Sequence, residues 1–543
     1  MRILYKIANK LFRIVKKILK LLTSRMVIIG VALLLEFCWL AGIMMQLNEK
    51  SVYINYAVTI LSLIAVLSII NNPKMNPGYK LMWAVCILAL PVTGICLYGI
   101  LGHSSVARKF RTHYDTVLLS QGGVLGEEEE TRKKLEEENI LAAGQSSYLT
   151  NYAHYPVYEN TETEYYPLGD VWFEHFIEEL KKAEHYIFME YFIISEGYLW
   201  DTVLEILKEK AAAMWGRILE VLARKAADGV DVRVIYDDFG CVTTLPYQYY
   251  KSLQQMGIKC AAFNQFRPVL NVILNNRDHR KIAVIDGHTA FTGGINLADE
   301  YINRKERFGH WKDSGICLHG EAVWSFTVMF LQMWNITEHR TDDYARYLYR
   351  PAAQKPKEPD GTGFVMPYGD SPLDNETVGQ HVYMDILNES RYYVHIMTPY
   401  LILDSDMITS LTFAAKRGIE TIIIMPHIPD KIYAYLLARS YYAELLQAGV
   451  KIYEYMPGFV HAKVFTSDNT KAVVGSINMD YRSLHLHFEC AVYLFRNPAV
   501  QQAEADFQET LKHCQEITLE DCRTYPMPKK IAGKVLRLFA PLM

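Results

Sequence analysis

The sequence predicts an α/β protein that contains two copies of one sheet-and-helix unit behind an apolar N-terminal region. The first observation is a repeated motif, because RDHRKIAVIDGHTAFTGGIN at 277–296 is matched by HAKVFTSDNTKAVVGSIN at 461–478. The second is that the flanking sequence repeats in the same order, with GVDVRVIYDD at 229 answered by GIETIIIMPH at 418. The third is a set of long apolar stretches near the N-terminus. A tandem duplication explains the first two observations.

Residues 1–25 predict a basic amphipathic helix. The segment MRILYKIANKLFRIVKKILKLLTSR is rich in Lys and Arg, contains no acidic residue, and repeats its basic and apolar residues at spacings of three and four. Such a helix suits the surface of an anionic leaflet. The alternative is a solvated basic tail that only sets orientation, and in both cases this end is expected to be cytoplasmic.

Residues 26–110 predict a transmembrane helical region. The apolar stretches of spanning length are 26–47, 52–70 and 81–101. Glu36 inside the first stretch is costly in lipid unless it faces a protein partner. A signal peptide is a poorer interpretation, because a long basic region precedes the first stretch.

The sequence leaves the membrane topology open. Two or three of these stretches can be true spans, and three spans from a cytoplasmic start place the rest of the chain outside. The basic residues that follow the last stretch favour the inside instead; they are Arg108, Lys109 and Arg111.

The remaining chain divides into a linker, two lobes and a tail. Residues 111–160 are expected to form a charged linker, whose acidic run GEEEETRKKLEEEN is interpreted as a solvated helix face. Helical and apolar strand patterns then alternate, which predicts layered sheets covered by helices. The predicted parts are lobe 1 at 161–342, a Pro-rich linker at 343–377, lobe 2 at 378–517 and a basic apolar tail at 518–543.

A short repeat lies inside lobe 1. LWDTVLEILKEKAAA at 199 is followed directly by MWGRILEVLARKAAD at 214. Fifteen residues advance a helix by about four turns plus 60°, so the two copies of one continuous helix cannot present the same face to the sheet. We therefore expect an elongated or doubled helix that protrudes from the lobe and has no catalytic part.

Composition excludes several classes of protein. The net charge of −4 gives no whole-chain reason to expect nucleic acid, and no basic stripe with stacking aromatics is present. The nine cysteines contain no CxxC pair, which argues against a metal site and a disulfide framework.

The repeated motif carries the chemistry. Residues two apart share one face of a strand, so His279 lies beside Lys281, and His461 beside Lys463. An imidazole next to an ammonium group makes an anion site with a titratable group. A chance polar edge is the alternative for one such stretch, but its repetition favours function.

The paired HxKxxxxD motifs resemble the two signatures of the phospholipase D superfamily. They comprise His279, Lys281, Asp286, His461, Lys463 and Asp468, and a glycine turn and an Asn follow each. Phrases such as GGINLADEYINR at 293 and VGSINMDYRSLHLHFE at 474 resemble bacterial cardiolipin synthases. The resemblance implies duplicated phospholipase D-like lobes, each a mixed sheet flanked by helices, in a multi-pass protein of the bacterial cytoplasmic membrane that uses no cofactor and no metal.

A phosphodiester resists attack because its oxygens are anionic, so a catalyst must neutralise them, supply a nucleophile and protonate the leaving oxygen. The groups expected to bind the phosphate are Lys281, Lys463, Asn296 and Asn478. The resemblance makes His279 the nucleophile and His461 the acid and base. The histidines need partners for their second nitrogens; the candidates are Asp313 and Glu489, with a surface carboxylate as the alternative. Asp286 and Asp468 belong to the family motif but are interpreted as structural ion-pair residues.

Three functions remain in competition. The preferred one is reversible phosphatidyl transfer between two phosphatidylglycerol molecules, which gives cardiolipin and glycerol through a phosphohistidine. The alternatives are a membrane-bound hydrolase or a transphosphatidylase with another alcohol, and a binding protein that has lost activity. The expected partners are phosphatidylglycerol, cardiolipin and anionic membrane lipid; the oligomeric state stays open. The departures from the family pattern are His487 where Asn is expected, Lys312 where Arg is usual, and a third apolar segment beyond the usual pair. The first two are expected to touch the rim of the active site and to alter rate or substrate choice.

Overall fold

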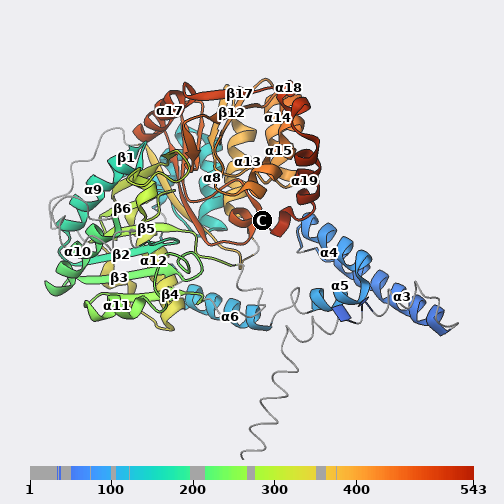
Figure 1. Cartoon of the computed structure of the whole chain (residues 1–543). Helices are drawn as coiled ribbons and strands as arrows, with labels where there is room; N and C mark the ends of the chain where they lie inside the picture. The colour runs from blue at the N-terminus through green and yellow to red at the C-terminus, as the bar shows by residue number, and fades with distance from the viewer. Residues whose placement is uncertain are drawn as a thin grey trace, which may run out of the picture. The chain divides into compact units, whose positions relative to one another are not determined.

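The computed structural model describes residues 33–34, 36–37 and 50–542, apart from 74, 100–104, 121–122, 127, 196–213, 266–275, 350–362 and 375. The chain divides into two compact units, one containing residues 1–112 and the other 113–266 and 276–543. Figure 1 shows the path of the chain. The expected helix at 1–25 lies outside the described residues.

The N-terminal unit contains helices α3 (Lys50–Ile70), α4 (Pro77–Ala89) and α5 (Pro91–Leu97). The expected continuous stretch 81–101 is interrupted, because Pro91 has no N–H to continue α4 and instead starts α5. Gly94 of α5 lies against the α4 backbone, where a Cβ would meet the Ile87 Cα at 2.7 Å. Within the described residues, no helix is both long and apolar enough to cross a bilayer.

Glu36 has the protein partner that its apolar surroundings require. Its side chain is buried, and its Oε2 accepts a hydrogen bond of 2.7 Å from the backbone N–H of Thr93. The N-terminal turn of α5 thus satisfies one oxygen of this carboxylate, whereas Oε1 has no hydrogen-bond partner among the described residues.

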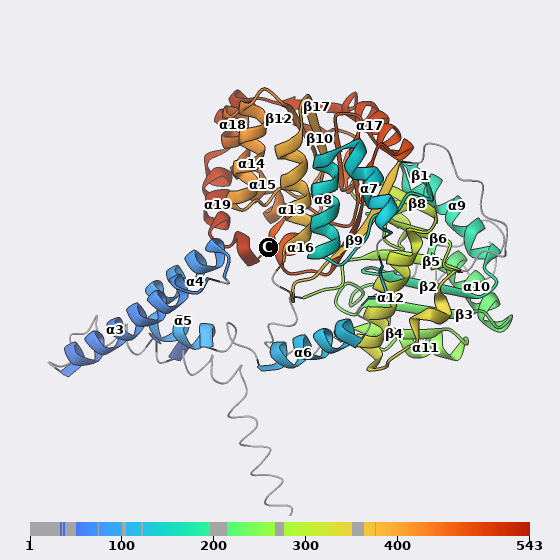
Figure 2. The same ribbon diagram turned by 180° about the vertical axis from the view of Figure 1, so that it is seen from behind.

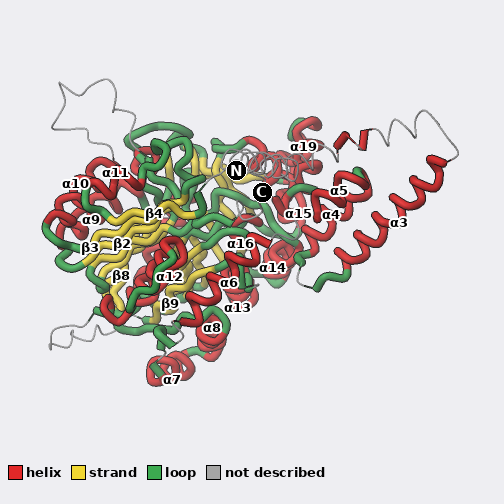
Figure 3. The backbone as a smooth tube through the Cα atoms, turned by 90° about the horizontal axis from the view of Figure 1, so that it is seen from below, coloured by secondary structure: helices red, strands yellow, loops and turns green. Residues whose placement is uncertain are grey.

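Lobe 1 is a seven-stranded mixed sheet with the order β1-β8-β6-β5-β2-β3-β4. The neighbours β2, β3 and β4 are parallel, and the other pairs are antiparallel. Figure 3 shows β2, β3 and β4 side by side, with β8 farther across the same sheet. Its strands are β1 (Thr161–Tyr166), β2 (Tyr186–Tyr191), β3 (Asp231–Asp237), β4 (Lys259–Phe263), β5 (Lys281–Ile285), β6 (Thr289–Gly293) and β8 (Gly315–Gly320). Its helices are α9 (Gly169–Lys182), α10 (Met214–Ala227), α11 (Tyr250–Gln255) and α12 (Val323–Glu338).

Lobe 2 repeats this strand order and adds one strand, as β9-β16-β15-β14-β10-β11-β12-β17. Its strands are β9 (Phe364–Asp370), β10 (Tyr393–Met397), β11 (Glu420–Pro426), β12 (Lys451–Tyr455), β14 (Val464–Ser467), β15 (Lys471–Gly475), β16 (Glu489–Phe495) and β17 (Cys514–Ile517). Its helices are α13 (Val378–Glu389), α14 (Ser405–Lys416), α15 (Ile432–Gln447), α16 (Tyr481–His485), α17 (Pro498–Leu511), α18 (Leu519–Thr524) and α19 (Met527–Arg537). The predicted duplication of a mixed sheet flanked by helices is confirmed.

Both predicted linkers contain regular structure. The first contains α6 (Ser105–Ser120), α7 (Glu129–Glu138) and α8 (Ile140–Asn151). Leu135 of α7 and Leu149 of α8 are buried in the core of lobe 2, and α8 lies beside α13 in Figure 2. The second linker supplies the edge strand β9, which pairs with β16. The apolar spacing inside a charged segment explains the difference, since a few buried leucines suffice to dock a helix.

The second copy of the short repeat is helix α10, and it does not protrude. Met214, Trp215 and Ile218 of this helix are completely buried in the core of lobe 1. The expectation of a protruding helix is wrong for this copy, because its apolar face covers the sheet. The first copy lies outside the described residues.

Two short pairings join the lobes. Strand β7 (His310–Lys312) of lobe 1 runs parallel to β13 (Gly458–Val460) of lobe 2. A second bridge joins Asp278 to Phe488. Each pairing ends beside one of the motif histidines.

Candidate active site

His279 is held at the bridge between its own lobe and lobe 2. Its backbone N–H donates to the Phe488 carbonyl at 2.9 Å, and the Phe488 N–H donates to the Arg277 carbonyl at 2.8 Å. The neighbouring Glu489 then reaches the His279 ring, with its carboxylate oxygens 2.9 and 3.0 Å from Nδ1. All of these groups are buried.

His461 is held in the same way by the other pairing. It directly follows β13, and its backbone N–H donates to the Lys312 carbonyl of β7 at 2.7 Å. The next residue, Asp313, places Oδ2 2.7 Å from Nδ1 of His461. Both side chains are buried.

The histidine–carboxylate pairs therefore cross between the lobes. The histidine of lobe 1 is paired with Glu489 of lobe 2, and the histidine of lobe 2 with Asp313 of lobe 1. In each pair Nδ1 is occupied, which leaves Nε2 as the ring nitrogen available to a substrate. The motifs alone predicted the four residues, but not which carboxylate serves which histidine.

Burial and the mutual interaction of His279 and Glu489 determine the protonation state of the first pair. Desolvation lowers the pKa of His279 to about 3, against the opposing effect of the Glu489 charge. Burial alone would raise the pKa of Glu489, but the interaction with His279 lowers it below its usual range. The state we infer has an ionised Glu489 that accepts the Nδ1–H of a neutral His279, whose Nε2 lone pair is free for attack.

In the second pair, as in the first, the pKa values of the histidine and of the carboxylate are both lowered. Burial and the charge of Lys463 together lower the pKa of His461 to about 4, against the opposing effect of Asp313. Lys463 Nζ lies 2.9 Å from Nδ1 of His461, while the pKa of Asp313 is lowered because the histidine and the lysine outweigh its burial. A bound phosphate anion would oppose both lysine and burial, so His461 becomes easier to protonate when the site is filled.

The two motif lysines, Lys281 and Lys463, are buried cations. Lys281 Nζ donates to the His279 carbonyl at 2.5 Å, and Lys463 donates to the His461 carbonyl. Burial lowers the pKa of Lys281 to about 8 and that of Lys463 to about 7, and the charge of Lys281 contributes to the second shift. Two ammonium groups that disfavour each other's charge are stabilised by an anion between them.

Small residues after the motif strands make the close approach possible. A Cβ on Gly294 would lie 2.1 Å from Asp313 Oδ1 and 3.0 Å from the His461 carbonyl oxygen. The corresponding position in lobe 2 is Ser476, whose hydroxyl donates to Glu489 at 2.5 Å. Gly294 thus leaves space for the Asp313 carboxylate, and Ser476 orients the Glu489 carboxylate.

The two motif asparagines differ in their contacts. Asn296 Oδ1 accepts from the Ile193 N–H at 3.0 Å, and its Nδ2 donates to the Tyr301 hydroxyl at 2.8 Å. Asn478 is also buried, but its Oδ1 has no hydrogen-bond partner within the described part of the chain. The unused group of Asn478 is thus an acceptor, and contact with a phosphate oxygen would have to come from its Nδ2 amide instead.

Asp286 and Asp468 lie at the far ends of the motif strands from the lysines. Asp286 accepts from the backbone N–H groups of residues 184–186, and Asp468 from those of 391–393. Both have positive φ, of 50° and 55°. The expected ion pairs are thus replaced by backbone hydrogen bonds, because each aspartate closes a turn against the start of the neighbouring strand.

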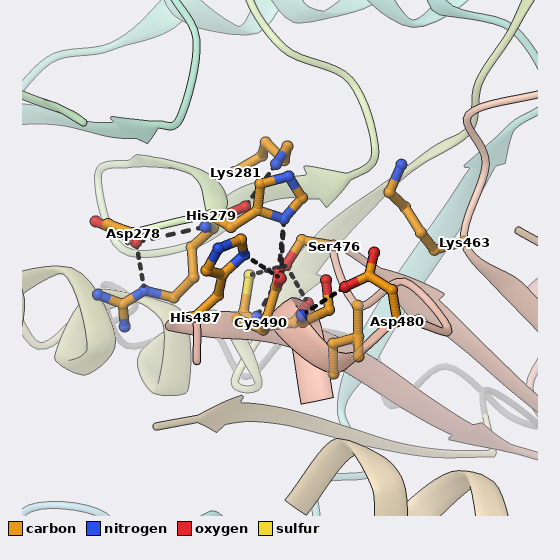
Figure 4. Close-up of polar contacts among 12 residues, drawn as sticks. Asp278, His279, Lys281, Lys463, Ser476, Asp480, His487 and Cys490 are labelled. Atoms are coloured by element: carbon orange, nitrogen blue, oxygen red, sulfur yellow. Dashed lines mark hydrogen bonds and ion pairs between the residues drawn. The ribbon is translucent and has the colours of Figure 1, made fainter. Parts of the chain in front are cut away.

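His487 is a third histidine in the site. Its ring centroid lies 5.4 Å from that of His279, and its Nδ1 lies 3.6 Å from Glu489. Figure 4 shows the two rings next to each other near Ser476. His279, His487 and Glu489 could place metal-ligand atoms within 4.8 Å of one another, although the ammonium of Lys281 nearby disfavours a cation.

The side chain of Lys312 points away from the two motif histidines. Its Nζ donates to Asp506 of α17 at 2.7 Å and also to the Pro167 carbonyl. It therefore clamps lobe 1 to lobe 2 behind the site, and the expectation that it touches the rim of the site is replaced by this structural contact.

Comparisons with known proteins agree with the geometry. The family described as cardiolipin synthase, PLD-like domain, matches residues 176–334 and 383–511, and a phospholipase D-nuclease N-terminal family matches 60–103. The chain is 44% identical to an uncharacterized protein of Streptococcus mutans, over 88% of this chain and 99% of that one. It is 32% identical to a cardiolipin synthase of Geobacillus sp., over 89% and 92%. The fold is similar to that of phosphatidylserine synthase from Haemophilus influenzae, with a TM-score of 0.50, 14% identity, and coverage of 70% of this chain and 95% of that one.

Proposed function

This chain belongs to the cardiolipin synthase family of phospholipase D-like proteins, and on that premise we propose that it transfers a phosphatidyl group from one phosphatidylglycerol to another. The products are cardiolipin and glycerol. The observation that supports this most directly is the crossed arrangement of two histidine–carboxylate pairs around two buried lysines. It provides a nucleophile, an acid and a cationic phosphate site without a protein-bound metal.

The first chemical step forms a phosphatidyl-enzyme. Nε2 of His279 attacks the phosphorus of one phosphatidylglycerol, and the bond from phosphorus to the headgroup glycerol oxygen breaks. His461 gives its proton to that oxygen, so glycerol leaves as the neutral alcohol. The two lysines and the Nδ2 amide of Asn478 donate to the non-bridging oxygens, where negative charge is concentrated.

The second step reverses these roles. His461, now neutral, takes the proton from a headgroup hydroxyl of a second phosphatidylglycerol, and the resulting oxygen attacks the phosphorus. The bond to His279 breaks and cardiolipin is released. One phosphodiester replaces another, so the reaction is close to balanced and excess glycerol drives it backwards. Transfer rather than hydrolysis requires that the lipid alcohol reaches the intermediate before water does.

Attachment to the bacterial cytoplasmic membrane is part of the proposal. Helix α3 exposes a run of large apolar side chains, among them Tyr56, Ile60, Ile64 and Leu67. Such a surface is unfavourable in water and suits a lipid environment. The multi-pass arrangement expected at 26–110 rests on these apolar stretches and on the matched N-terminal family. A membrane location also concentrates both lipid substrates at the enzyme.

The test uses purified full-length protein in phosphatidylglycerol bilayers, with the products followed by mass. We expect cardiolipin and glycerol in equal amounts, suppressed by added glycerol. Phosphatidic acid as the main product would support the hydrolase instead. His279→Ala and His461→Ala should each abolish turnover, and only the variant that retains His279 can accumulate a phosphatidyl-enzyme. Half activity in either variant would contradict a single shared site.

A further inference from the structure

One face of the C-terminal helix α19 packs against lobe 2. It packs along α15, and Gly533 makes the contact, because a Cβ there would lie 2.4 Å from the Leu436 carbonyl oxygen. Gly533 is buried. A glycine at this position lets the two helix backbones approach closely, so α19 has a fixed orientation on lobe 2.

The opposite face of α19 is apolar and exposed. Met527, Ile531 and Val535 recur four residues apart, which places them on one side of the helix. Their exposed fractions are 62%, 57% and 56%. Phe539 and Leu542, just beyond the helix, are exposed as well. Because Gly533 faces lobe 2, the apolar stripe formed by Met527, Ile531 and Val535 faces outward.

A basic pocket lies beside this stripe. It occupies about 260 Å³ between α15, α18 and α19, and its cationic lining residues are Arg439, Arg523, Lys529, Lys530 and Lys534. Arg439 is already paired with Glu454 at 2.9 Å. Arg523 is likewise paired with Glu520, at 3.6 Å. Within the described residues no salt bridge joins Lys529 or Lys534 to an acidic side chain, so these two lysines give the pocket its uncompensated positive charge.

We propose that α19 is an interfacial helix whose apolar stripe enters the bilayer surface while the basic pocket takes the phosphate of an anionic phospholipid headgroup. The inference rests on the proposed function, which places the substrate in a bilayer. A phospholipid carries its phosphate directly next to its acyl chains, and the pocket carries its lysines directly next to the stripe. The lysines and the apolar stripe thus lie next to each other in the same order as the phosphate and the acyl chains of the lipid. This site is separate from the histidines and would hold lobe 2 against the leaflet.

The first experiment places a photoreactive benzoylphenylalanine at position 531 of the full-length protein in mixed phosphatidylcholine and phosphatidylglycerol vesicles. After illumination, lipid adducts on the peptide are measured by mass. We expect adducts in which phosphatidylglycerol is enriched several-fold over its share of the bilayer. The matched control is position 413, since Phe413 of α14 is similarly exposed, at 53%, but lies outside the stripe. Equal adducts at both positions, or none at 531, would overturn the inference.

The charge is tested by the double variant Lys529→Gln, Lys534→Gln, with the exposed pair Lys181→Gln, Lys251→Gln of lobe 1 as control. The first variant should lose the phosphatidylglycerol enrichment and require about tenfold more phosphatidylglycerol for half-maximal rate in bilayers. Its rate on short-chain, monomeric phosphatidylglycerol should stay unchanged. Unchanged enrichment would refute the headgroup pocket. A wild-type protein that forms no cardiolipin but gives the expected adducts would instead refute only the proposed function.

Discussion

Replacing each carboxylate that crosses the site should slow a different chemical step. Glu489→Gln and Asp313→Asn keep the shapes of the side chains but remove the charge that faces Nδ1 of His279 and His461, at 2.9 and 2.7 Å. A hydrogen bond to a charged group contributes about 1.5–3 kcal/mol. If that is lost from the transition state, turnover falls about 10- to 150-fold.

The assay compares two donors in single-turnover experiments, phosphatidylglycerol and a phosphatidyl ester of p-nitrophenol. The p-nitrophenolate leaves without a proton, so formation of the phosphatidyl-enzyme from it needs the nucleophile but not the acid. Asp313→Asn should therefore be slow with the natural donor and near normal with the activated one. Glu489→Gln should be slow with both, because it weakens the nucleophile itself.

The control is Glu504→Gln, which alters a pair of the same kind outside the site. His395 Nδ1 lies 2.9 and 3.1 Å from the oxygens of Glu504, and this carboxylate is also largely buried. The variant should lose stability to unfolding but retain its rate with both donors. Equal rescue of the two site variants by the activated donor would refute the assignment of nucleophile and acid, as would rescue of Glu489→Gln alone.

Three further outcomes are expected. Burial lowers the pKa of the two motif lysines to about 8 and about 7, so the affinity for inorganic phosphate should fall as the pH rises through this range. Without ligand, the free energy of unfolding should rise with pH towards pH 10, because the lysines of the unfolded chain stay protonated to higher pH than those of the folded protein. Calorimetry and thermal unfolding check both signs, and pH-independent affinity would contradict them. Gly294→Ala should lower turnover at least about tenfold by displacing Asp313, whereas Gly216→Ala, which meets no atom within 4 Å, should not; normal activity in the first variant would show that the turn can yield. Deletion of 199–213 should leave activity within a few-fold, because α10 keeps its buried contacts; a folded but inactive deletion would show that this copy has a role.

The duplicated sheet and the histidine–lysine pairs were predictable because they depend on local patterns. Alternating apolar residues fix which side chains share a strand face, and the repeat indicates that the second lobe contains the same elements in the same order along the chain. His279 and Lys281 could therefore be placed together from the sequence. The role of Asp286 was harder to predict, since only the positive φ and the three backbone donors reveal that it closes a turn.

Which carboxylate contacts which histidine could not be predicted, because the pairing depends on contacts between distant segments. Glu489 reaches His279 only through the bridge at Phe488, and no local pattern encodes that pairing. The same holds for Leu135, which lies in a segment with the composition of a solvated linker but is buried in lobe 2. Lys312 was misplaced for a related reason, since its partner Asp506 belongs to the other lobe.

The crossed pairs also bear on the synthesis of the chain. His279 is separated from Glu489 by 210 residues, so a ribosome must complete almost all of lobe 2 before the carboxylate that prepares this histidine exists. A nascent or truncated chain that contains lobe 1 alone thus lacks both the carboxylate that contacts His279 and the second motif histidine. On the proposed mechanism such incomplete chains would be inactive towards lipid, and activity would begin only when the full-length polypeptide has folded.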